Sequence, residues 1–282
     1  MSFAKQNPKI PEGINTSSDN PLKEFTILLG GILLVICAIA ALLLIFSHQL
    51  APHIPFRYEQ ALVNKFSELT SDNNSTEQTM IDAELALQEL GHQLAENSAL
   101  APDIELHFHL LDEPDVPNAF ATLGGHIFVT TGLLREVPSE NALAMVLAHE
   151  IAHIKFRHPA QSISGGLLVQ LFLSIVTGQN AVALQGTVQQ AGIMTVLGFS
   201  RKMEIAADRA ALDTLEQHYG HLADAEVFFE KILAKHQQAS WQSIFASHPD
   251  MQQRIEQIKK RTQNTKTGAT KALDPRLDYQ NL

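Results

Sequence analysis

This 282-residue sequence lacks the features on which several protein classes depend. Its one cysteine, Cys37, cannot form an intrachain disulfide, so no disulfide framework supports the fold. Lysine and arginine together number 20 against 30 aspartate and glutamate residues, and the net charge of −10 argues against nucleic acid as a partner. We also find no internal repeats, which argues against a repeat architecture.

Charge is absent from Thr26–Phe46 (TILLGGILLVICAIAALLLIF), a run long enough to cross a bilayer as a helix. A cleaved signal peptide is the alternative interpretation. Against it, residues 1–25 form a long polar leader, the apolar core exceeds the usual ~7–15 residues, and no small-x-small cleavage site follows directly. We therefore predict a transmembrane anchor over residues 26–46 that binds the chain to the lipid bilayer.

Basic residues around the anchor predict its orientation. Lys5, Lys9 and Lys23 precede the run, whereas Arg57 and Lys65 follow it at a distance. This excess favours a cytoplasmic N-terminus. In a Gram-negative-like cell, the chain would cross the inner membrane once and place its bulk in the periplasm.

Four regions are predicted along the chain. They are a polar N-terminal tail (1–25), the anchor (26–46), one sizeable domain (47–262) and a flexible polar C-terminal tail (263–282).

An apolar helix in the predicted domain, Ala142–Ile154 (ALAMVLAHEIAHI), carries three ionisable side chains. His149 and His153 are four residues apart and therefore share one helix face, where they can hold a metal ion together. Glu150 can reach a water on that ion and take its proton. Ionisable groups in so apolar a helix are costly unless paired or bound to metal. We predict a zinc site rather than two core histidines beside a stray glutamate.

A second predicted helix, Arg201–Arg209, carries Glu204 and Asp208 four residues apart. Catalytic zinc typically takes three protein ligands and keeps one position for water, so Glu204 is the predicted third ligand of one Zn²⁺ per chain. Asp208 would accept the free ring N–H of His149 and fix the orientation of that ring. The alternative is that both carboxylates pair with nearby basic residues on a solvated face.

Together these motifs resemble those of a known group of enzymes. H-E-x-x-H followed by E-x-x-x-D is the pattern of the gluzincin metallopeptidases. The closer resemblance is to the membrane-associated family that contains the CaaX prenyl protease, the bacterial heat-shock membrane protease and their periplasmic and mitochondrial quality-control relatives. The similar segments lie between about Phe56 and Arg261 and include Asn118–Leu134, Ser200–Asp208 and Ser247–Pro249 with Arg254–Ile255. One departure is Leu123, where many relatives have proline before the paired glycines, and it concerns the local turn rather than the chemistry.

The resemblance implies an α+β, mainly helical zincin-like metallopeptidase domain with a small sheet and an exposed edge strand. It implies an endopeptidase with Glu150 as general base, acting on misfolded or envelope proteins in quality control. An extended polypeptide would pair with the edge strand, a sequence-tolerant mode of binding. The residues expected along this substrate are Asn118, Ala119, Phe120, Gly125 and His126.

His248, which precedes Pro249, is a further catalytic candidate with more than one possible role. It would donate to the developing oxyanion, or occupy the open zinc position in a resting, self-inhibited state. A plain role at the start of a helix is the third interpretation.

Hydrophobic periodicity predicts elements on either side of the zinc helix. Ser75–Asn97 is typical of an amphipathic helix, opened by a Ser75/Gln78 capping box. Ile104–Leu111 alternates strictly and predicts a strand with one wet face. On that face His107 and His109 are solvated or, as an alternative, form a second metal site.

Short strands are also predicted at Asn118–Ala121 and His126–Thr130, joined through Gly124 and Gly125, and Ser139 is the predicted N-cap of the zinc helix. Ile163–Phe199 is apolar with interspersed glycine and glutamine. It is either a hairpin over the active site or the lipid surface, or ordinary helical core.

Two other functional classes stay open. A chaperone or scaffold would use the zinc fold for binding, but its signature would be loss of the glutamate, and Glu150 is present. A metal-dependent hydrolase of a non-protein envelope substrate is the second class. The predicted edge strand favours peptides over that substrate without excluding it.

Overall fold

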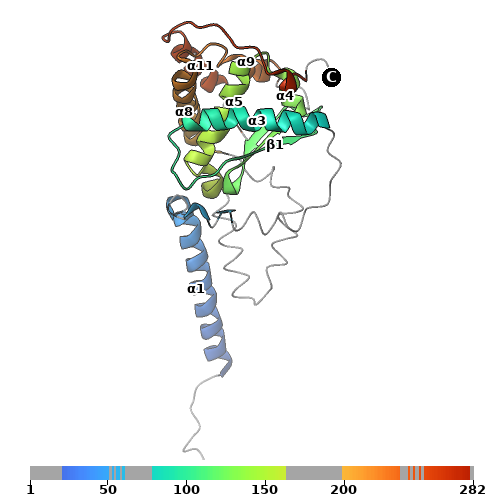
Figure 1. Cartoon of the computed structure of the whole chain (residues 1–282). Helices are drawn as coiled ribbons and strands as arrows, with labels where there is room; N and C mark the ends of the chain where they lie inside the picture. The colour runs from blue at the N-terminus through green and yellow to red at the C-terminus, as the bar shows by residue number, and fades with distance from the viewer. Residues whose placement is uncertain are drawn as a thin grey trace, which may run out of the picture. The chain divides into compact units, whose positions relative to one another are not determined.

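The structure is a computed structural model (Figure 1). It describes residues 21–50, 53, 55–57, 59–60, 78–162, 199–235, 241, 244, 248 and 251–279. The chain forms two units, one up to Leu42 and a larger one from Leu43 onward. The predictions for the polar residues before Pro21, for the Ser75 cap and for residues 163–198 lie outside the described residues.

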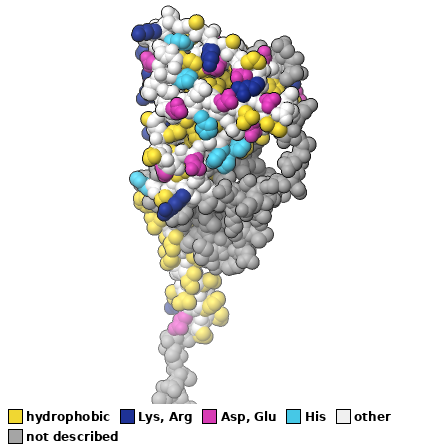
Figure 2. All heavy atoms as spheres, viewed as in Figure 1, with side chains coloured by type: hydrophobic (Ala, Val, Ile, Leu, Met, Phe, Trp, Pro, Cys, Tyr) yellow, Lys and Arg dark blue, Asp and Glu magenta, His cyan; other side chains and the backbone are white. Residues whose placement is uncertain are grey.

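Helix α1 (Pro21–Leu50) contains the predicted anchor and extends beyond residues 26–46 at both ends. Its segment Pro21–Leu42 has a mean hydropathy of 2.8 and is long and apolar enough to cross a membrane. Hydrophobic side chains cover its surface (Figure 2), and Leu33, for example, is 60 % exposed. Because exposure of so much apolar surface to water is unfavourable, α1 is the candidate membrane span of this chain.

The second unit is mainly helical with one small sheet. Its described elements are α3 (Gln78–Glu96), β1 (His107–Leu111), β2 (Ala119–Ala121), the 3₁₀ turn η2 (Leu123–Gly125), β3 (His126–Thr130), α4 (Thr131–Glu136), α5 (Glu140–Lys155), α8 (Arg201–Tyr219), α9 (Val227–Ala234), α11 (Met251–Thr262) and the 3₁₀ turn η4 (Pro275–Leu277). This composition confirms the predicted α+β class.

The sheet has the strand order β1-β3-β2, with β1 parallel and β2 antiparallel to β3. Strand β3 has the predicted bounds, whereas β1 is shorter than the predicted Ile104–Leu111. The reason is its partner, since β3 pairs with β1 only from His107 to Leu111. Strand β2 is an edge of the described sheet, and β3 is its central strand.

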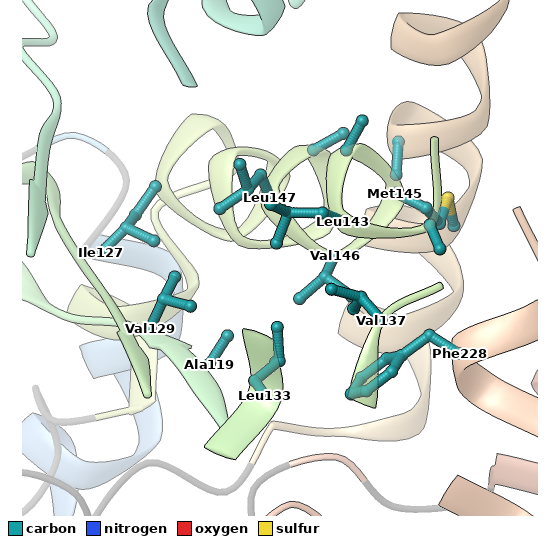
Figure 3. Close-up of a cluster of buried hydrophobic side chains, with 14 of the residues drawn as sticks. Ala119, Ile127, Val129, Leu133, Val137, Leu143, Met145, Val146, Leu147 and Phe228 are labelled. Atoms are coloured by element: carbon teal, nitrogen blue, oxygen red, sulfur yellow. The ribbon is translucent and has the colours of Figure 1, made fainter. Parts of the chain in front are cut away.

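The two faces of the sheet differ as its alternating pattern predicts. Buried side chains of β1 and β3, among them Phe108 and Ile127, lie on one face, which α3 and α5 cover. Figure 3 shows Ile127 and Val129 facing Leu147 and its neighbours on α5. The sheet thereby fixes the position of α5, the predicted zinc helix.

The C-terminal segment is ordered against the domain, so the prediction of a flexible tail over residues 263–282 is wrong for its described part. The backbone N–H of Glu140 donates to the carbonyl of Lys271 at 3.0 Å, and the N–H of Lys271 donates to Asn141 Oδ1 at 2.7 Å. Leu277 and Tyr279 are buried in the core, at 1 % and 8 % exposure. The buried side chains of Leu277 and Tyr279, together with these hydrogen bonds, hold a segment whose composition is polar.

Candidate metal centre

Helix α5 places His149, Glu150 and His153 in the interior. The Oγ of Ser139 accepts a hydrogen bond from the N–H of Ala142 at 3.2 Å, which confirms the predicted N-cap. The three ionisable side chains are 2 %, 2 % and 0 % exposed. The Nε2 atoms of the two histidines are 3.0 Å apart, so both can contact one ion.

Helix α8 packs against α5 and brings Glu204 to the same point. One carboxylate oxygen of Glu204 is 3.5 Å from His149 Nε2, and the other is 3.4 Å from His153 Nε2. Glu204 and Asp208 are 0 % and 5 % exposed. These carboxylates therefore do not lie on a solvated face, and Glu204 occupies the position that a third ligand requires.

His248 joins this group from the segment before α11. Its Nδ1 is 3.2 Å from each carboxylate oxygen of Glu204 and 3.4 Å from His149 Nε2. Its Nε2 is 3.6 Å from Glu150 Oε1. His248 thus lies beside both the candidate ligands and the candidate base, although it is distant from them in sequence.

The chemistry of this group fits a metal ion. His149, His153, Glu204 and His248 each offer one ligand atom, and these atoms lie within 4.8 Å of one another. Among the described residues, no other group of three or more such side chains can hold an ion. His248 Nε2 and Glu150 Oε2 are buried with no hydrogen-bond partner in the described part of the chain. Since buried polar groups usually have partners, these atoms also indicate a ligand at the site.

The electrostatics of the site favour the metal-binding forms of Glu204 and His153. Burial alone would raise the pKa of Glu204, but the neighbouring His248, His149 and His153 hold it far below its usual range. Burial lowers the pKa of His153 well below its ordinary value, which leaves the neutral imidazole that binds metals. Burial raises the pKa of Glu150, which suits a carboxylate that holds a proton during a reaction.

Asp208 lies between His149 and Arg254. Its Oδ1 is 2.9 Å from His149 Nδ1, which is the contact that the sequence predicts. Burial alone would raise the pKa of Asp208, but Arg254 and His149 lower it to about 2. Conversely, burial alone would lower the pKa of His149, whereas Asp208 and Glu204 raise it to about 9. A carboxylate on the ring nitrogen that faces away from the metal orients a ligating histidine.

Sequence reasoning assigns no role to Arg254, which is 1 % exposed. Its Nε and Nη2 donate to the two oxygens of Asp208 at 2.7 and 2.8 Å, and its Nη1 is 2.5 Å from Glu204 Oε2. The sequence does contain a signal that Arg254 is buried, because this residue lies on the same face of α11 as the buried Met251 and Ile255. An arginine buried on an apolar face requires an anionic partner.

Strand β2 runs past the candidate base. The backbone N–H of Ala121 donates to the Glu150 carboxylate. Ala119 adjoins Glu150 and His149, and Asn118 and Phe120 are buried at 6 % exposure each. In the described sheet β2 pairs with β3 alone, so its other edge has no strand partner there, and α5 contacts this strand.

Gly125 and His126 do not share the edge position that the sequence predicts for them. His126 begins β3, which pairs with β1 on one side and β2 on the other, so backbone pairing with a substrate is blocked there. Gly125 has a φ of 83°, and a Cβ at this position would come 1.9 Å from the carbonyl oxygen of Glu105. The glycine is needed for the turn and for this close approach.

A small cavity adjoins the candidate base, lined by residues that include Ala119, Glu150, Phe229 and His248. Its volume of about 10 Å³ has room for about one water molecule. It does not accommodate a peptide.

The two histidines on the wet face of β1 form a stack rather than part of a larger ligand group. The ring of His126 stacks on those of His107 and His109, and His126 Nδ1 is 2.8 Å from His109 Nε2. Burial, with contributions from His109 and His107, lowers the pKa of His126 to about 4. These side chains belong to no group of three or more potential ligands among the described residues.

Comparison with known proteins supports the resemblance read from the motifs. The model of peptidase family M48 matches residues 82–262, more than half of the chain. The mitochondrial metalloendopeptidase OMA1 of Schizosaccharomyces pombe is 35 % identical over 159 residues, which cover 55 % of this chain and 46 % of that protein. A putative beta-barrel assembly-enhancing protease of Vibrio cholerae is 28 % identical over 206 residues, with coverages of 68 % and 41 %. The beta-barrel assembly-enhancing protease of Escherichia coli K12 is 30 % identical over 181 residues, with coverages of 58 % and 35 %. This chain therefore spans less than half the length of these curated relatives.

Proposed function

The chain belongs to peptidase family M48, and on this premise we propose that it is a membrane-anchored zinc endopeptidase that cleaves misfolded or envelope proteins. The observation that carries the proposal is the buried group of His149, His153 and Glu204 with Glu150 beside it. Two histidines, one carboxylate and an adjacent glutamate are the ligands and general base that metal-dependent peptide hydrolysis requires.

His149, His153 and Glu204 would hold the zinc ion, which when bound supplies the Lewis acidity for attack on a peptide carbonyl. Glu150 takes the proton of the attacking water and passes it to the leaving amine. The raised pKa of Glu150 supports this role, since it lets the carboxyl hold the transferred proton, and the hydrogen bond from the Ala121 N–H orients the carboxylate.

We propose that an extended polypeptide pairs with the edge of β2 that has no strand partner in the described sheet, along Asn118, Ala119 and Phe120. The passage of this strand beside Glu150 supports the assignment. Backbone pairing tolerates many sequences, as expected for unfolded substrates. The relatives, a mitochondrial metalloendopeptidase and a beta-barrel assembly-enhancing protease by name, agree with a role in protein quality control.

We propose that His248 is a further ligand of the metal site in its resting state. A substrate would displace His248 from this position. Its Nδ1 lies 3.2 Å from both oxygens of Glu204 and within the ligand group, which supports this role over that of a helix-start residue. The small cavity at Glu150 agrees with a resting state closed to substrate.

The metal site is tested with the full chain purified in detergent. We expect one zinc per chain, cleavage of labelled unfolded casein, and loss of cleavage when a chelator is added. Glu204→Ala should lose the metal, whereas Glu216→Ala on the same helix should retain it, because Glu216 makes a surface ion pair with Arg261. Wild-type zinc affinity in Glu204→Ala would refute the third-ligand assignment.

We propose that α1 holds the enzyme in a bacterial inner membrane, with the domain in the periplasm. The exposed apolar surface of Pro21–Leu42 and the basic Lys23 at its start support this topology. Protease added to spheroplasts should digest the domain, and intact cells should protect it. Digestion only after rupture of the inner membrane would reverse the orientation.

A further inference from the structure

The turn that ends helix α5 has an unusual backbone conformation. Arg157 has a φ of 59°, in the left-handed region that non-glycine residues rarely adopt. Such a conformation is unfavourable for a residue with a Cβ and persists where the surroundings hold it. It directs the chain back toward α5 directly after the metal-ligand helix.

Glu59 holds Arg157 in this conformation. The Nε and Nη2 of Arg157 both donate to Glu59 Oε1, at 3.0 and 2.5 Å, and Glu59 is 8 % exposed. The other carboxylate oxygen of Glu59 accepts from the N–H of Gly124 at 3.2 Å. The guanidinium carbon of Arg157 lies 5.3 Å from the centroid of the Phe56 ring, a cation–π contact. We call Phe56, Glu59 and Arg157 the clamp.

The turn places His158 against the metal-ligand histidine. His158 Nδ1 is 2.9 Å from His153 Nδ1, and the two side chains are 5 % and 0 % exposed. The ring of Phe199 stacks on that of His153 at 3.9 Å between centroids. The stacked ring of Phe199 and the contact between Nδ1 of His153 and His158 thus hold the His153 side chain. Its other nitrogen, Nε2, points to His149 and Glu204.

We propose that His158 is a positioning residue for the metal ligand His153, and that the clamp holds it in place. The proposal rests on the metal site proposed above. If His153 binds the ion through Nε2, its Nδ1 carries the proton and donates to Nδ1 of His158. His158 is then a neutral acceptor with its own proton on Nε2. His149 has a carboxylate, Asp208, in the equivalent position, so the two histidine ligands are oriented by chemically different partners.

The experiment measures the rate at which the full-length, zinc-loaded protein in detergent releases its metal to a chromogenic chelator. His158→Leu removes the acceptor and should release zinc on the order of 10–100-fold faster, as loss of such a partner does. His158→Asn keeps an acceptor oxygen at the place of Nδ1 and should largely restore the wild-type rate. Thermal unfolding of the metal-free proteins serves as the control for folding.

A second readout distinguishes positioning from general packing. In the zinc-loaded protein, ¹⁵N NMR of histidine should place the His158 proton on Nε2 and the His153 proton on Nδ1. The opposite tautomers, or a wild-type release rate in a folded His158→Leu, would overturn the positioning role. If the wild type itself binds no zinc, the proposed function fails instead, so the two failures are distinguishable.

The clamp is tested by Glu59→Gln, with Glu89→Gln as the matched control. Glu89 makes an exposed ion pair with Arg276, remote from the metal ligands in sequence and on the surface. We expect Glu59→Gln to release zinc several-fold faster and Glu89→Gln to behave as wild type. Equal rates in the two variants would remove the clamp from the proposal. Because Phe56 and Glu59 follow α1 in the chain, a confirmed effect would connect the segment after the anchor to the metal site.

Discussion

Helices α1 and α5 are both strongly apolar, yet their surroundings are opposite. Leu33 on α1 is 60 % exposed, whereas Leu147 on α5 is 0 % exposed. The segment Thr26–Phe46 of α1 contains no charged residue. Helix α5, by contrast, carries the buried ionisable side chains of His149, Glu150 and His153. Apolar composition alone therefore does not distinguish a helix suited to lipid from one buried in protein. The ionisable groups on one face make the distinction, because they require partners that only a folded domain supplies.

The most severe test of the comparison removes the charge that α5 has and α1 lacks. Glu150→Gln should lower kcat by on the order of 10²–10⁴-fold, because a general base contributes about that much. The zinc content should stay at the wild-type value, since the ligands are intact. Turnover of unfolded casein and metal stoichiometry are measured on the same sample. Full activity in this variant would remove Glu150 from the mechanism.

The same substitution in both helices tests their different environments. Leu147→Ala should lower the free energy of unfolding of the domain by about 2–5 kcal/mol, because it leaves a cavity in a packed core. Leu33→Ala should leave that value unchanged, because its side chain lies outside the core. Denaturant unfolding is followed by the fluorescence of the single tryptophan, Trp241, which is buried. Equal effects of the two substitutions would contradict the comparison.

His248 supplies a partner to the ionisable groups of α5 from a distant segment. If His248 is a ligand of the resting site, His248→Ala should raise basal cleavage, including self-cleavage. If it donates to the oxyanion, the same change should lower kcat by on the order of 10²-fold. Initial rates with unfolded casein and the zinc content are measured together. Unchanged rates with unchanged zinc would leave His248 as a helix-start residue.

Asp208 is expected to have the mildest effect among the site residues. Asp208→Asn keeps the shape of the side chain but removes the charge that faces His149 and Arg254. We expect metal affinity or activity to fall roughly 10–100-fold, the range for partners of metal-ligating histidines. Zinc competition with a chelator of known affinity gives the measurement. No change in either quantity would leave Asp208 as a structural partner of Arg254 alone.

Local patterns predicted the elements that carry the site. The four-residue spacings of His149 with His153 and of Glu204 with Asp208 require a helix to bring each pair onto one face, and α5 and α8 supply it. The Ser139 cap and the bounds of β3 were also predictable, because capping and alternation are properties of a short stretch of chain.

Partners from distant segments were not predictable in the same way. Strand β1 begins at His107 because β3 extends no further beside it. His126 is on the central strand because β3 pairs with β1 on the side opposite β2. The polar segment after α11 is ordered because Leu277 and Tyr279 find places in the core. Each outcome depends on which segments meet, and local periodicity carries no information about that.

By itself, the sequence determined the helical character of α1 and α5, the pairing of two histidines on one helix face and of two carboxylates on another, and the chemistry these residue types support. Those properties follow from backbone geometry within a few turns of one helix. Only the tertiary structure decided that Arg254 joins Asp208 to Glu204, that His248 lies against the ligands, and that His158 contacts His153. The first two bring together residues far apart in the chain, and the third depends on a left-handed turn at Arg157 that Glu59 holds in place. Such contacts are decided by the packing of the whole domain, because only there does a buried charge find its partner.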